Sequence, residues 1–232
     1  MKFKSLREEC FEANMMLPKL NLVIFTFGNV SCIDRNTSVF AIKPSGVPYE
    51  ILKWEDIVIC DFDGNVVDGK LRPSSDTKTH AVLYNNWSSI GGIAHTHSTY
   101  GTSWAQSLYD IPVFGTTHAD YLTHDIPCAL PMKDELILGD YEINTGHQII
   151  DCLKERGLNH EEVEMILVGS HAPFTWGNTA AKAVHNSAVL EQCAQMAYLT
   201  LQINPGTNRL KDTLIQKHHQ RKHGPDSYYG QS

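Results

Sequence analysis

The stretch Gly91-Gly-Ile-Ala-His-Thr-His-Ser98 is the most informative part of this sequence, because an apolar run ends there on two histidines. We expect a buried strand over residues 91–96. Residues i and i+2 of a strand point to the same face, so His95 and His97 can converge on one metal ion. Taken alone, such a pair more often marks two hydrogen-bonded histidines at a strand end than a metal site.

A third histidine would complete a catalytic metal site, and the sequence offers two candidates. His171 follows a predicted strand over residues 165–169, and His118 lies in the segment Thr117-His-Ala-Asp120. Spacing alone leaves both open. Three histidines around an ion with a vacant position are typical of catalytic zinc, because the vacancy admits substrate oxygens. The histidines therefore favour a metal enzyme.

Composition restricts the class of protein. The chain has 232 residues, with 42% apolar and 19% charged residues and a net charge of −7 from 19 Lys and Arg against 26 Asp and Glu. These values fit one folded domain and exclude a disordered, collagen-like or coiled-coil chain. The negative charge argues against nucleic acid or an anionic membrane as the main partner.

Cysteine spacing and the N-terminus indicate where such a protein resides. The six cysteines are scattered without a Cys-x-x-Cys pair, which is typical of reduced thiols. The first residues contain no apolar run of the kind found in signal peptides. Residues 79–109 carry no Asp, Glu, Lys or Arg, but their His, Ser, Thr and Asn side chains would be costly in a membrane. We expect a soluble cytoplasmic protein.

Hydrophobic periodicity and turn residues predict helices alternating with strands. The predicted strands cover residues 22–27, 39–42, 57–60, 91–96 and 165–169, and the predicted helices cover residues 5–17, 75–84, 145–156, 179–202 and 207–223. Asp61-Phe-Asp-Gly-Asn65 is expected to form a hairpin turn and not a calcium loop. This alternation predicts a single α/β or α+β domain with helices on both faces of a sheet.

Three loops rich in small residues could hold a phosphate group. They are Gly28-Asn-Val-Ser31, Lys43-Pro-Ser-Gly46 and Pro73-Ser-Ser-Asp76. The third opens a predicted helix, where free N–H groups favour an anion. Each loop by itself is typical of an ordinary turn or helix cap. Their occurrence around a charge-poor, histidine-rich centre favours a phosphorylated small molecule as the ligand.

The C-terminal segment Lys217-His-His-Gln-Arg-Lys-His223 admits two interpretations. Its basic residues could bind nucleic acid, but cations in the last turn of a helix also complement the helix dipole. We favour the second interpretation, with Arg221 facing an anionic ligand. Tyr228 and Tyr229 are unusual in a chain terminus and suggest that this end docks against protein.

Taken together, these segments resemble the L-ribulose-5-phosphate 4-epimerase family of the class II, metal-dependent aldolase superfamily. The matching segments run in order along nearly the whole chain: Gly28-Asn-Val-Ser31, Ile42-Lys-Pro-Ser-Gly46, Arg72-Pro-Ser-Ser-Asp-Thr77, Gly91-Gly-Ile-Ala-His-Thr-His-Ser98, Gly115-Thr-Thr-His-Ala-Asp-Tyr121, His171-Ala-Pro-Phe-Thr-Trp-Gly177, Ala183-Val-His-Asn186, Arg221-Lys-His-Gly224 and Tyr228-Tyr-Gly-Gln231. Two positions depart from the family pattern. Ala172 replaces a common Gly, which leaves the orientation of His171 in question, and Phe27 replaces a common Trp.

The resemblance implies a fold and an assembly. The fold is α/β: a single α/β/α domain over residues 1–232, around a mainly antiparallel central sheet. The assembly is a homotetramer with active sites between subunits, in which residues 207–232 reach the neighbouring subunit's site.

The resemblance also implies the site residues. Zn²⁺ is bound by His95, His97 and His171, with Asp76 as an acidic fourth group. Asp120 and Tyr229 form the acid/base pair. Substrate binding falls on Gly28, Asn29, Lys43, Ser45, Gly46, Ser74 and Ser75.

The implied reaction is the zinc-dependent 4-epimerisation of L-ribulose 5-phosphate to D-xylulose 5-phosphate, in pentose or ascorbate catabolism. Cleavage of C3–C4, rotation of glycolaldehyde phosphate and recombination would invert C4. An alternative is a class II sugar-phosphate aldolase that releases its aldehyde, since the three histidines do not distinguish the two. A binding module such as the adducin head domain is a third alternative, but it would be expected to lose the metal histidines.

Overall fold

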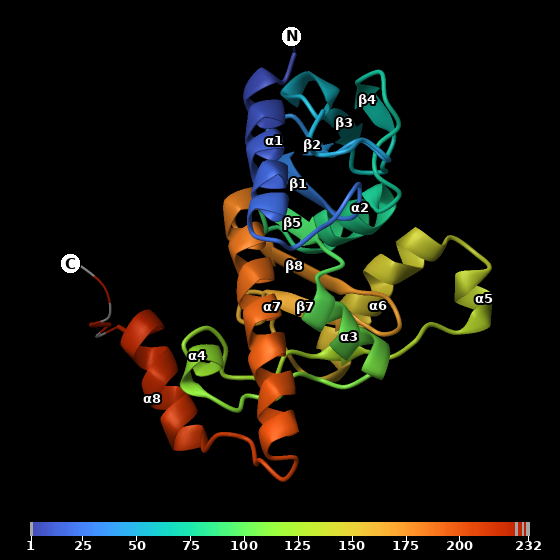
Figure 1. Cartoon of the computed structure of the whole chain (residues 1–232). Coiled ribbons are helices and arrows are strands. Elements are labelled where there is room, and N and C mark those ends of the chain that lie inside the picture. Colours follow the sequence, from blue (N-terminus) through green and yellow to red (C-terminus); the bar gives the residue numbers. More distant parts are fainter. Residues whose placement is uncertain (1, 226, 229, 231–232) are drawn as a thin grey trace.

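An eight-stranded sheet forms the centre of the computed structural model, which describes residues 2–225, 227, 228 and 230 (Figure 1). The strands are β1 (Asn29–Asp34), β2 (Val39–Ile42), β3 (Val58–Asp61), β4 (Val66–Asp68), β5 (Gly92–His95), β6 (Cys128–Ala129), β7 (Met165–Val168) and β8 (Pro173–Gly177). Their order across the sheet is β4-β3-β2-β1-β5-β8-β7-β6. Neighbours pair antiparallel except β6 and β7, which are parallel, so the expected mainly antiparallel sheet is confirmed.

Helices cover both faces of this sheet, as Figure 1 shows. The helices of the described chain are α1 (Lys4–Lys19), η1 (Trp54–Asp56, a 3-10 turn), α2 (Thr77–Asn86), α3 (Thr99–Ser107), α4 (Thr116–Ala119), α5 (Asp134–Ile137), α6 (Tyr141–Glu155), α7 (Ala180–Ile203) and α8 (Asp212–His223), of which α4, α5 and α8 lie away from the sheet. Side chains of α1 and the first turns of α7 form one core, and side chains of α2 and α6 form another on the opposite face. The result is the expected three-layer α/β/α domain.

Strand β2 illustrates how the sequence builds this arrangement. Phe40 and Ile42 pack into the core under α2 and α6, whereas Val39 and Ala41 pack into the core under α1. Successive side chains of a strand point to opposite faces, so a strand with helices on both sides must be apolar at every position. All four residues of β2 are buried, as this requires.

The strand that carries the first metal-ligand candidate lies at the centre of the sheet. β5 pairs with β1 on one side and with β8 on the other. A Cβ atom added to Gly92 would clash with the backbone of Ala180, so glycine allows the start of α7 to approach the strand. Thr179 caps α7 by accepting a hydrogen bond of 3.1 Å from the Lys182 N–H. The close approach fixes one end of β5, and His95 lies at the other.

Several expected boundaries are wrong for identifiable reasons. Residues 22–27 form turns and no strand, because Phe25 and Gly28 adopt left-handed backbone conformations with φ of 55° and 72°. The helix predicted from residue 145 begins at Tyr141. The last helix begins at Asp212, after a segment whose Leu210 N–H donates to the Val113 carbonyl at 2.7 Å.

The charge-free segment over residues 79–109 divides among α2, β5 and α3. Within the described ranges, no helix has the length and apolar character needed to cross a membrane. Buried residues of α2 and β5 belong to the core of the domain, and His95 ends β5.

Candidate metal centre and active site

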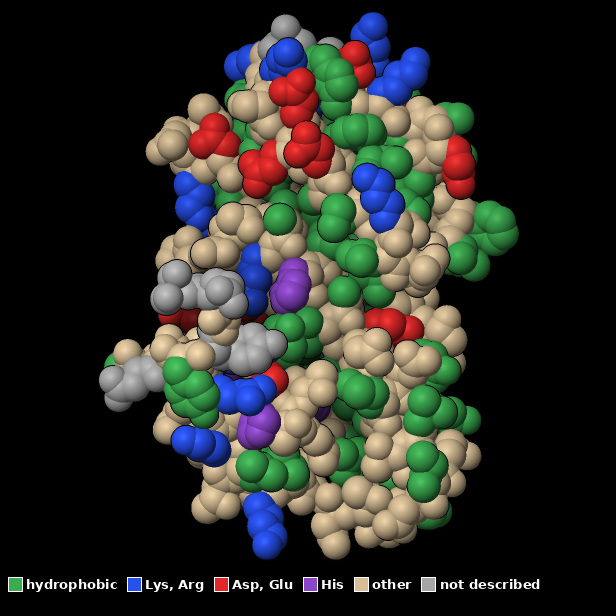
Figure 2. Space-filling model, turned by 60° about the vertical axis from the view of Figure 1, so that its left-hand side comes forward, with side chains coloured by type: hydrophobic (Ala, Val, Ile, Leu, Met, Phe, Trp, Pro, Cys, Tyr) green, Lys and Arg blue, Asp and Glu red, His purple; other side chains and the backbone are tan. Residues whose placement is uncertain are grey.

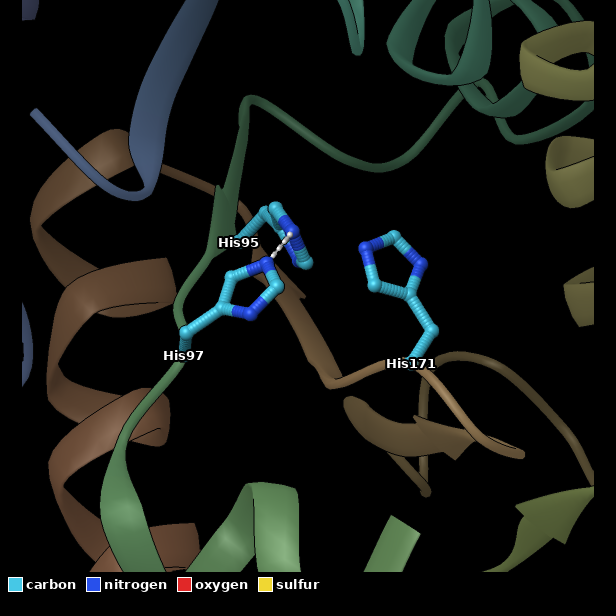
Figure 3. A group of neighbouring side chains, drawn as sticks. All are labelled: His95, His97 and His171. Carbon is cyan, nitrogen blue, oxygen red and sulfur yellow. Dashed lines mark hydrogen bonds between the residues drawn. The ribbon is translucent and has the colours of Figure 1, made fainter. Parts of the chain in front are cut away.

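Three histidines from two separate segments of the chain converge beside the central strands (Figure 3). His95 and His97 come from the end of β5, and His171 comes from the turn between β7 and β8. One ring nitrogen from each lies within 4.8 Å of the others. His95 is buried, His171 is half-buried and His97 is exposed, so the group opens to solvent on one side. The structure thus brings His171, and not His118, to the strand-end pair.

Hydrogen bonding fixes which nitrogen of His95 faces the group. Its Nδ1 lies 2.9 Å from the Pro173 carbonyl, which can only accept, so Nδ1 carries the proton and Nε2 presents a lone pair. That Nε2 lies 3.0 Å from the Nε2 of His97. A backbone carbonyl behind the ring is the usual partner of a metal-binding histidine. The ring also stacks on Phe174, with centroids 4.1 Å apart.

The turn that carries His171 holds its backbone in an unusual conformation. Ser170 has a φ of 60°, a left-handed value that is costly for a residue with a side chain. Ala172 is buried and does not adopt a left-handed φ, so alanine at this position causes no backbone strain. The Nδ1 atom of His171 is buried and has no hydrogen-bond partner within the described part of the chain.

The electrostatics of the three histidines favour neutral rings. Burial lowers the pKa of His95 to about 3, against the opposing effect of Asp76. Burial also lowers the pKa of His97 and of His171. Only neutral imidazole can donate a lone pair to a metal ion. Three neutral rings, each presenting one nitrogen to the others, fit a divalent metal ion.

A cavity of about 400 Å³ joins the three histidines to the predicted phosphate loops. Its lining consists of Thr26, Phe27, Gly28, Asn29, Lys43, Pro44, Ser45, Gly46, Ser74, Ser75, Asp76, His95, His97 and His171. Each residue predicted to bind metal or substrate lies in this set. Two of the loops are brought together by backbone bonds, in which Ser45 N–H donates to the Arg72 carbonyl and Ser74 N–H donates to the Lys43 carbonyl.

Asp76 lies at the rim of the histidine group and not within it. Its carboxylate accepts a hydrogen bond of 2.6 Å from the Asn29 amide, and its oxygens are outside the set of ligand atoms within 4.8 Å. Burial tends to raise the pKa of Asp76, but His95, His80 and the Asn29 hydrogen bond outweigh it, so this pKa is lowered. Asp76 therefore places a negative charge beside the candidate metal ligands.

Two glycines, Gly28 and Gly46, give the phosphate loops a backbone shape that can bind an anion. A Cβ atom on Gly28 would lie 2.7 Å from Val23 Cγ1 and 2.8 Å from the His95 carbonyl oxygen, so this position requires glycine. A Cβ atom on Gly46 would meet open space, but its φ of 68° also favours glycine. Free backbone amides in such left-handed turns form concave sites for anions.

Lys43 is a buried cation at the floor of these loops. Its Nζ donates to the Val47 carbonyl at 2.7 Å and lies 4.7 Å from the centre of the Tyr49 ring. Burial lowers its pKa to about 8. The ammonium group therefore stabilises the loop that carries Ser45 and Gly46, and it adds positive charge to the cavity.

Asp120 lies away from this cavity, at the end of α4. Its carboxylate accepts hydrogen bonds from Arg221 at 2.9 Å and from His218 at 3.0 Å, and Lys222 Nζ lies 3.6 Å away. Burial opposes ionisation, but the hydrogen bonds from Arg221 and His218 dominate and lower the pKa of Asp120. Arg221 thus faces a carboxylate of its own chain.

Figure 2 shows basic and histidine side chains gathered around the end of the described chain. The sequence prediction singled out Arg221 there but missed His218, although the two are three residues apart and so share one face of α8. Tyr229, the predicted partner of Asp120, lies outside the described residues. The structure therefore brings together every predicted metal and substrate residue, but it separates Asp120 from them.

The fold and the histidine group define a class of protein. The family model described as Class II Aldolase and Adducin N-terminal domain matches residues 8–198. This chain therefore belongs to the class II aldolase family.

The curated relatives with high sequence identity to this chain share one name. The L-ribulose-5-phosphate 4-epimerase UlaF of Salmonella paratyphi A is 51% identical over 228 residues, covering 98% of this chain and 99% of the relative. The protein of the same name from Salmonella typhi shows the same values. The match to the relatives thus extends over nearly the whole chain, including the C-terminal segment beyond residue 198.

Solved structures support the fold independently. An L-fuculose 1-phosphate aldolase superposes with a TM-score of 0.77 at 24% identity, covering 94% of this chain and 95% of the aldolase. The L-fuculose-1-phosphate aldolase of Thermus thermophilus gives a TM-score of 0.67 at 18% identity, covering 88% of this chain and 98% of that aldolase. At these identities the likeness shows a shared fold.

Proposed function

We propose that this chain is a zinc-dependent L-ribulose-5-phosphate 4-epimerase that forms D-xylulose 5-phosphate. The observation that carries the proposal is the cavity in which three converging histidines adjoin the three loops rich in small residues. Full-length relatives of that activity support the choice of substrate. Because its substrate is a charged sugar phosphate of pentose or ascorbate catabolism, we assign the enzyme to the cytoplasm.

Inversion at C4 of this substrate cannot proceed by simple deprotonation, because the C4 hydrogen is not acidic. Cleavage of the C3–C4 bond avoids the difficulty. Removal of the C4 hydroxyl proton forms the aldehyde of glycolaldehyde phosphate, and the bonding electrons leave on the three-carbon fragment as an enediolate. The aldehyde then presents its other face, the bond forms again, and a proton returns to the C4 oxygen.

We assign the metal site to His95, His97 and His171, with Asp76 as the neighbouring acidic group. When bound, zinc would supply Lewis-acid stabilisation of the negative charge that develops on the sugar oxygens, worth several kcal/mol. Three histidines around an ion with an open position are the usual protein ligands of catalytic zinc. The carbonyl of Pro173 holds His95 in the tautomer that this role requires.

The loops on the other side of the cavity are assigned to the phosphate group. The residues are Gly28, Asn29, Lys43, Ser45, Gly46, Ser74 and Ser75. Left-handed glycines expose backbone amides, the serines supply hydroxyl donors, and Lys43 supplies a cation. These contacts must keep the aldehyde fragment in the cavity while it turns, since an escaping fragment would end the reaction as an aldol cleavage.

Proton transfer is assigned to Asp120 and Tyr229, acting from a neighbouring subunit of a homotetramer. Asp120 is not among the residues that line the cavity of its own chain, which supports an active site shared between subunits. Helix α8 buries Ile215, and its His218 and Arg221 contact Asp120. Most of its other described side chains are exposed or half-buried, which leaves a surface for a second copy, so we assign residues 207–232 to that contact.

The test uses purified protein that is stripped with a chelator and then reloaded with Zn²⁺. We expect the reloaded protein to convert L-ribulose 5-phosphate to D-xylulose 5-phosphate, and the stripped protein to do so roughly 100-fold more slowly or worse. Equal rates for the two preparations would contradict the metal dependence. An absence of turnover by protein that has bound zinc would contradict the assigned substrate.

A further inference from the structure

The start of helix α3 is held by a carboxylate from a distant helix. Glu191 of α7 accepts hydrogen bonds from the Tyr100 N–H at 2.9 Å and from the Gly101 N–H at 2.8 Å, one on each carboxylate oxygen. Ser98, at the cap position of α3, makes no side-chain capping bond. N–H groups in the first turn of a helix have no partner within the helix. Glu191 therefore supplies the cap that the local sequence lacks.

This first turn lies next to the candidate metal ligands in the chain. His97 precedes the cap residue Ser98 directly, and α3 begins at Thr99. The backbone between β5 and α3 is held on one side by the sheet at His95 and by a 3.4 Å hydrogen bond from the Thr96 N–H to the Pro173 carbonyl, and on the other side by Glu191 at Tyr100 and Gly101. His97 lies between the two sides, so its position depends on both.

The same turn also packs on the residue that orients His95. A Cβ atom on Gly101 would lie 2.9 Å from Pro173 Cγ and 2.8 Å from Leu190 Cδ2, so the helix start presses closely against both. The Pro173 carbonyl accepts the Nδ1 proton of His95. Displacement of this turn would therefore disturb the positions of both His95 and His97.

We propose that Glu191 is a positioning residue of the metal centre, which holds the start of α3 so that His97 and His95 keep their mutual geometry. The proposal rests on the metal site assigned under the proposed function. An ionised carboxylate suits the position because the helix N-terminus carries partial positive charge. Glutamine offers one oxygen in place of two, and alanine offers none, so the two substitutions should form a graded series.

The probe is Co²⁺ alone, whose visible absorption reports ligand geometry and whose affinity is measured by competition with a chelator. We expect Glu191→Ala to weaken Co²⁺ binding about tenfold and to change the absorption spectrum, as loss of a group supporting metal ligands commonly does. Glu191→Gln should fall between this variant and the unchanged protein. If Glu191→Ala fails to fold, Glu191→Gln carries the test.

Thr179→Ala is the matched control, because it also removes a side-chain cap from a helix but acts at the opposite end of β5. We expect it to lower the melting temperature of the metal-free protein while its Co²⁺ affinity and spectrum stay unchanged. Equal weakening of Co²⁺ binding in both variants, or unchanged binding in Glu191→Ala, would overturn the positioning role of Glu191 and leave the metal-site assignment standing. Failure of the unchanged protein to bind Co²⁺ would overturn the metal site as well.

Discussion

The Asn29 side-chain amide donates a hydrogen bond of 2.6 Å to the Asp76 carboxylate. The same amide donates to Ser74 Oγ at 3.1 Å, so the first residue of β1 is tied to the loop that opens α2. This connection joins two segments that are far apart in sequence and that both line the cavity. Two of the phosphate loops and the acidic group beside the histidines are thus linked by hydrogen bonds.

Replacement of Asn29 with alanine should weaken this connection. Loss of two hydrogen bonds, one of them to a charged group, should lower the free energy of unfolding by about 1–3 kcal/mol. The KM for L-ribulose 5-phosphate should rise about tenfold, because the loops that bind phosphate lose their common support. Chemical denaturation and steady-state kinetics measure the two effects. Asn86→Ala removes an exposed amide bond to Val82 and should leave KM unchanged; a similar rise in both variants would contradict the prediction.

His97→Asn should abolish metal binding and epimerase activity together. The variant removes one of three converging ring nitrogens and leaves the strand and the buried His95 in place. Metal content by atomic emission and turnover by product assay check the two properties on the same sample. His147→Asn changes an exposed histidine of α6 and serves as control. Retained metal with full activity in His97→Asn would exclude this residue as a ligand.

Asp120→Asn should suppress epimerisation but leave the metal content normal, because Asp120 lies outside the histidine group. Loss of a proton-transfer group typically slows turnover by about 10²–10⁴-fold. Asp125→Asn is the control, since it breaks an ion pair of similar length with Arg209 in the neighbouring loop. Loss of zinc in Asp120→Asn, or equal loss of activity in both variants, would show that the residue acts through structure.

The epimerase activity should decline above about pH 8, because Lys43 loses its proton there. Burial lowers the pKa of its ammonium group to about 8, so the cation beside the phosphate loops disappears as the pH rises through that value. The pH profile of kcat/KM reports groups of the free enzyme and should show this alkaline limb. Lys43→Arg keeps a cation at all these pH values and should remove the limb. An identical alkaline limb in the variant would assign it to another group.

The metal-free protein should lose stability as the pH falls from about 6.5 to about 4. Burial lowers the pKa of His80 and of His118 to about 4 and that of His95 to about 3. The unfolded chain binds protons in this window that the folded chain does not, so the free energy of unfolding decreases with decreasing pH. Each histidine contributes a slope of about 1.4 kcal/mol per pH unit.

Urea unfolding at several pH values measures this slope. His118→Gln should reduce it by the contribution of one histidine, because His118 is buried away from the metal centre and donates to the His124 carbonyl. A free energy of unfolding that stays constant between pH 6.5 and pH 4 would show that these histidines are protonated in the folded protein.

Much of the fold could be predicted from the sequence, because segments with regular apolar spacing form the helices and strands that this spacing predicts. The predicted strand 39–42 is β2, and the predicted helix 179–202 differs from α7 by one residue at each end. Residues 22–27 have the composition of a strand, but left-handed turns at Phe25 and Gly28 interrupt them. Such turns depend on close tertiary contacts, such as that between Gly28 and Val23, which composition does not reveal.

The metal-ligand candidates could be predicted in part. Period-two spacing placed His95 and His97 on one face, but spacing left His118 and His171 as alternatives. The choice depends on sheet order: β8 pairs with β5, so the turn before β8 lies beside the end of β5. The contacts of Glu191 and His218 were missed for the same reason, since each joins residues about 90 or more positions apart.

The most direct test follows both products of one reaction. Zinc-loaded protein is incubated with L-ribulose 5-phosphate while D-xylulose 5-phosphate and free glycolaldehyde phosphate are measured together, with a chelator-treated sample in parallel. The account predicts chelator-sensitive formation of D-xylulose 5-phosphate with little free aldehyde, since the loops retain the fragment. Free glycolaldehyde phosphate as the main product would contradict it and would identify an aldolase that releases its aldehyde.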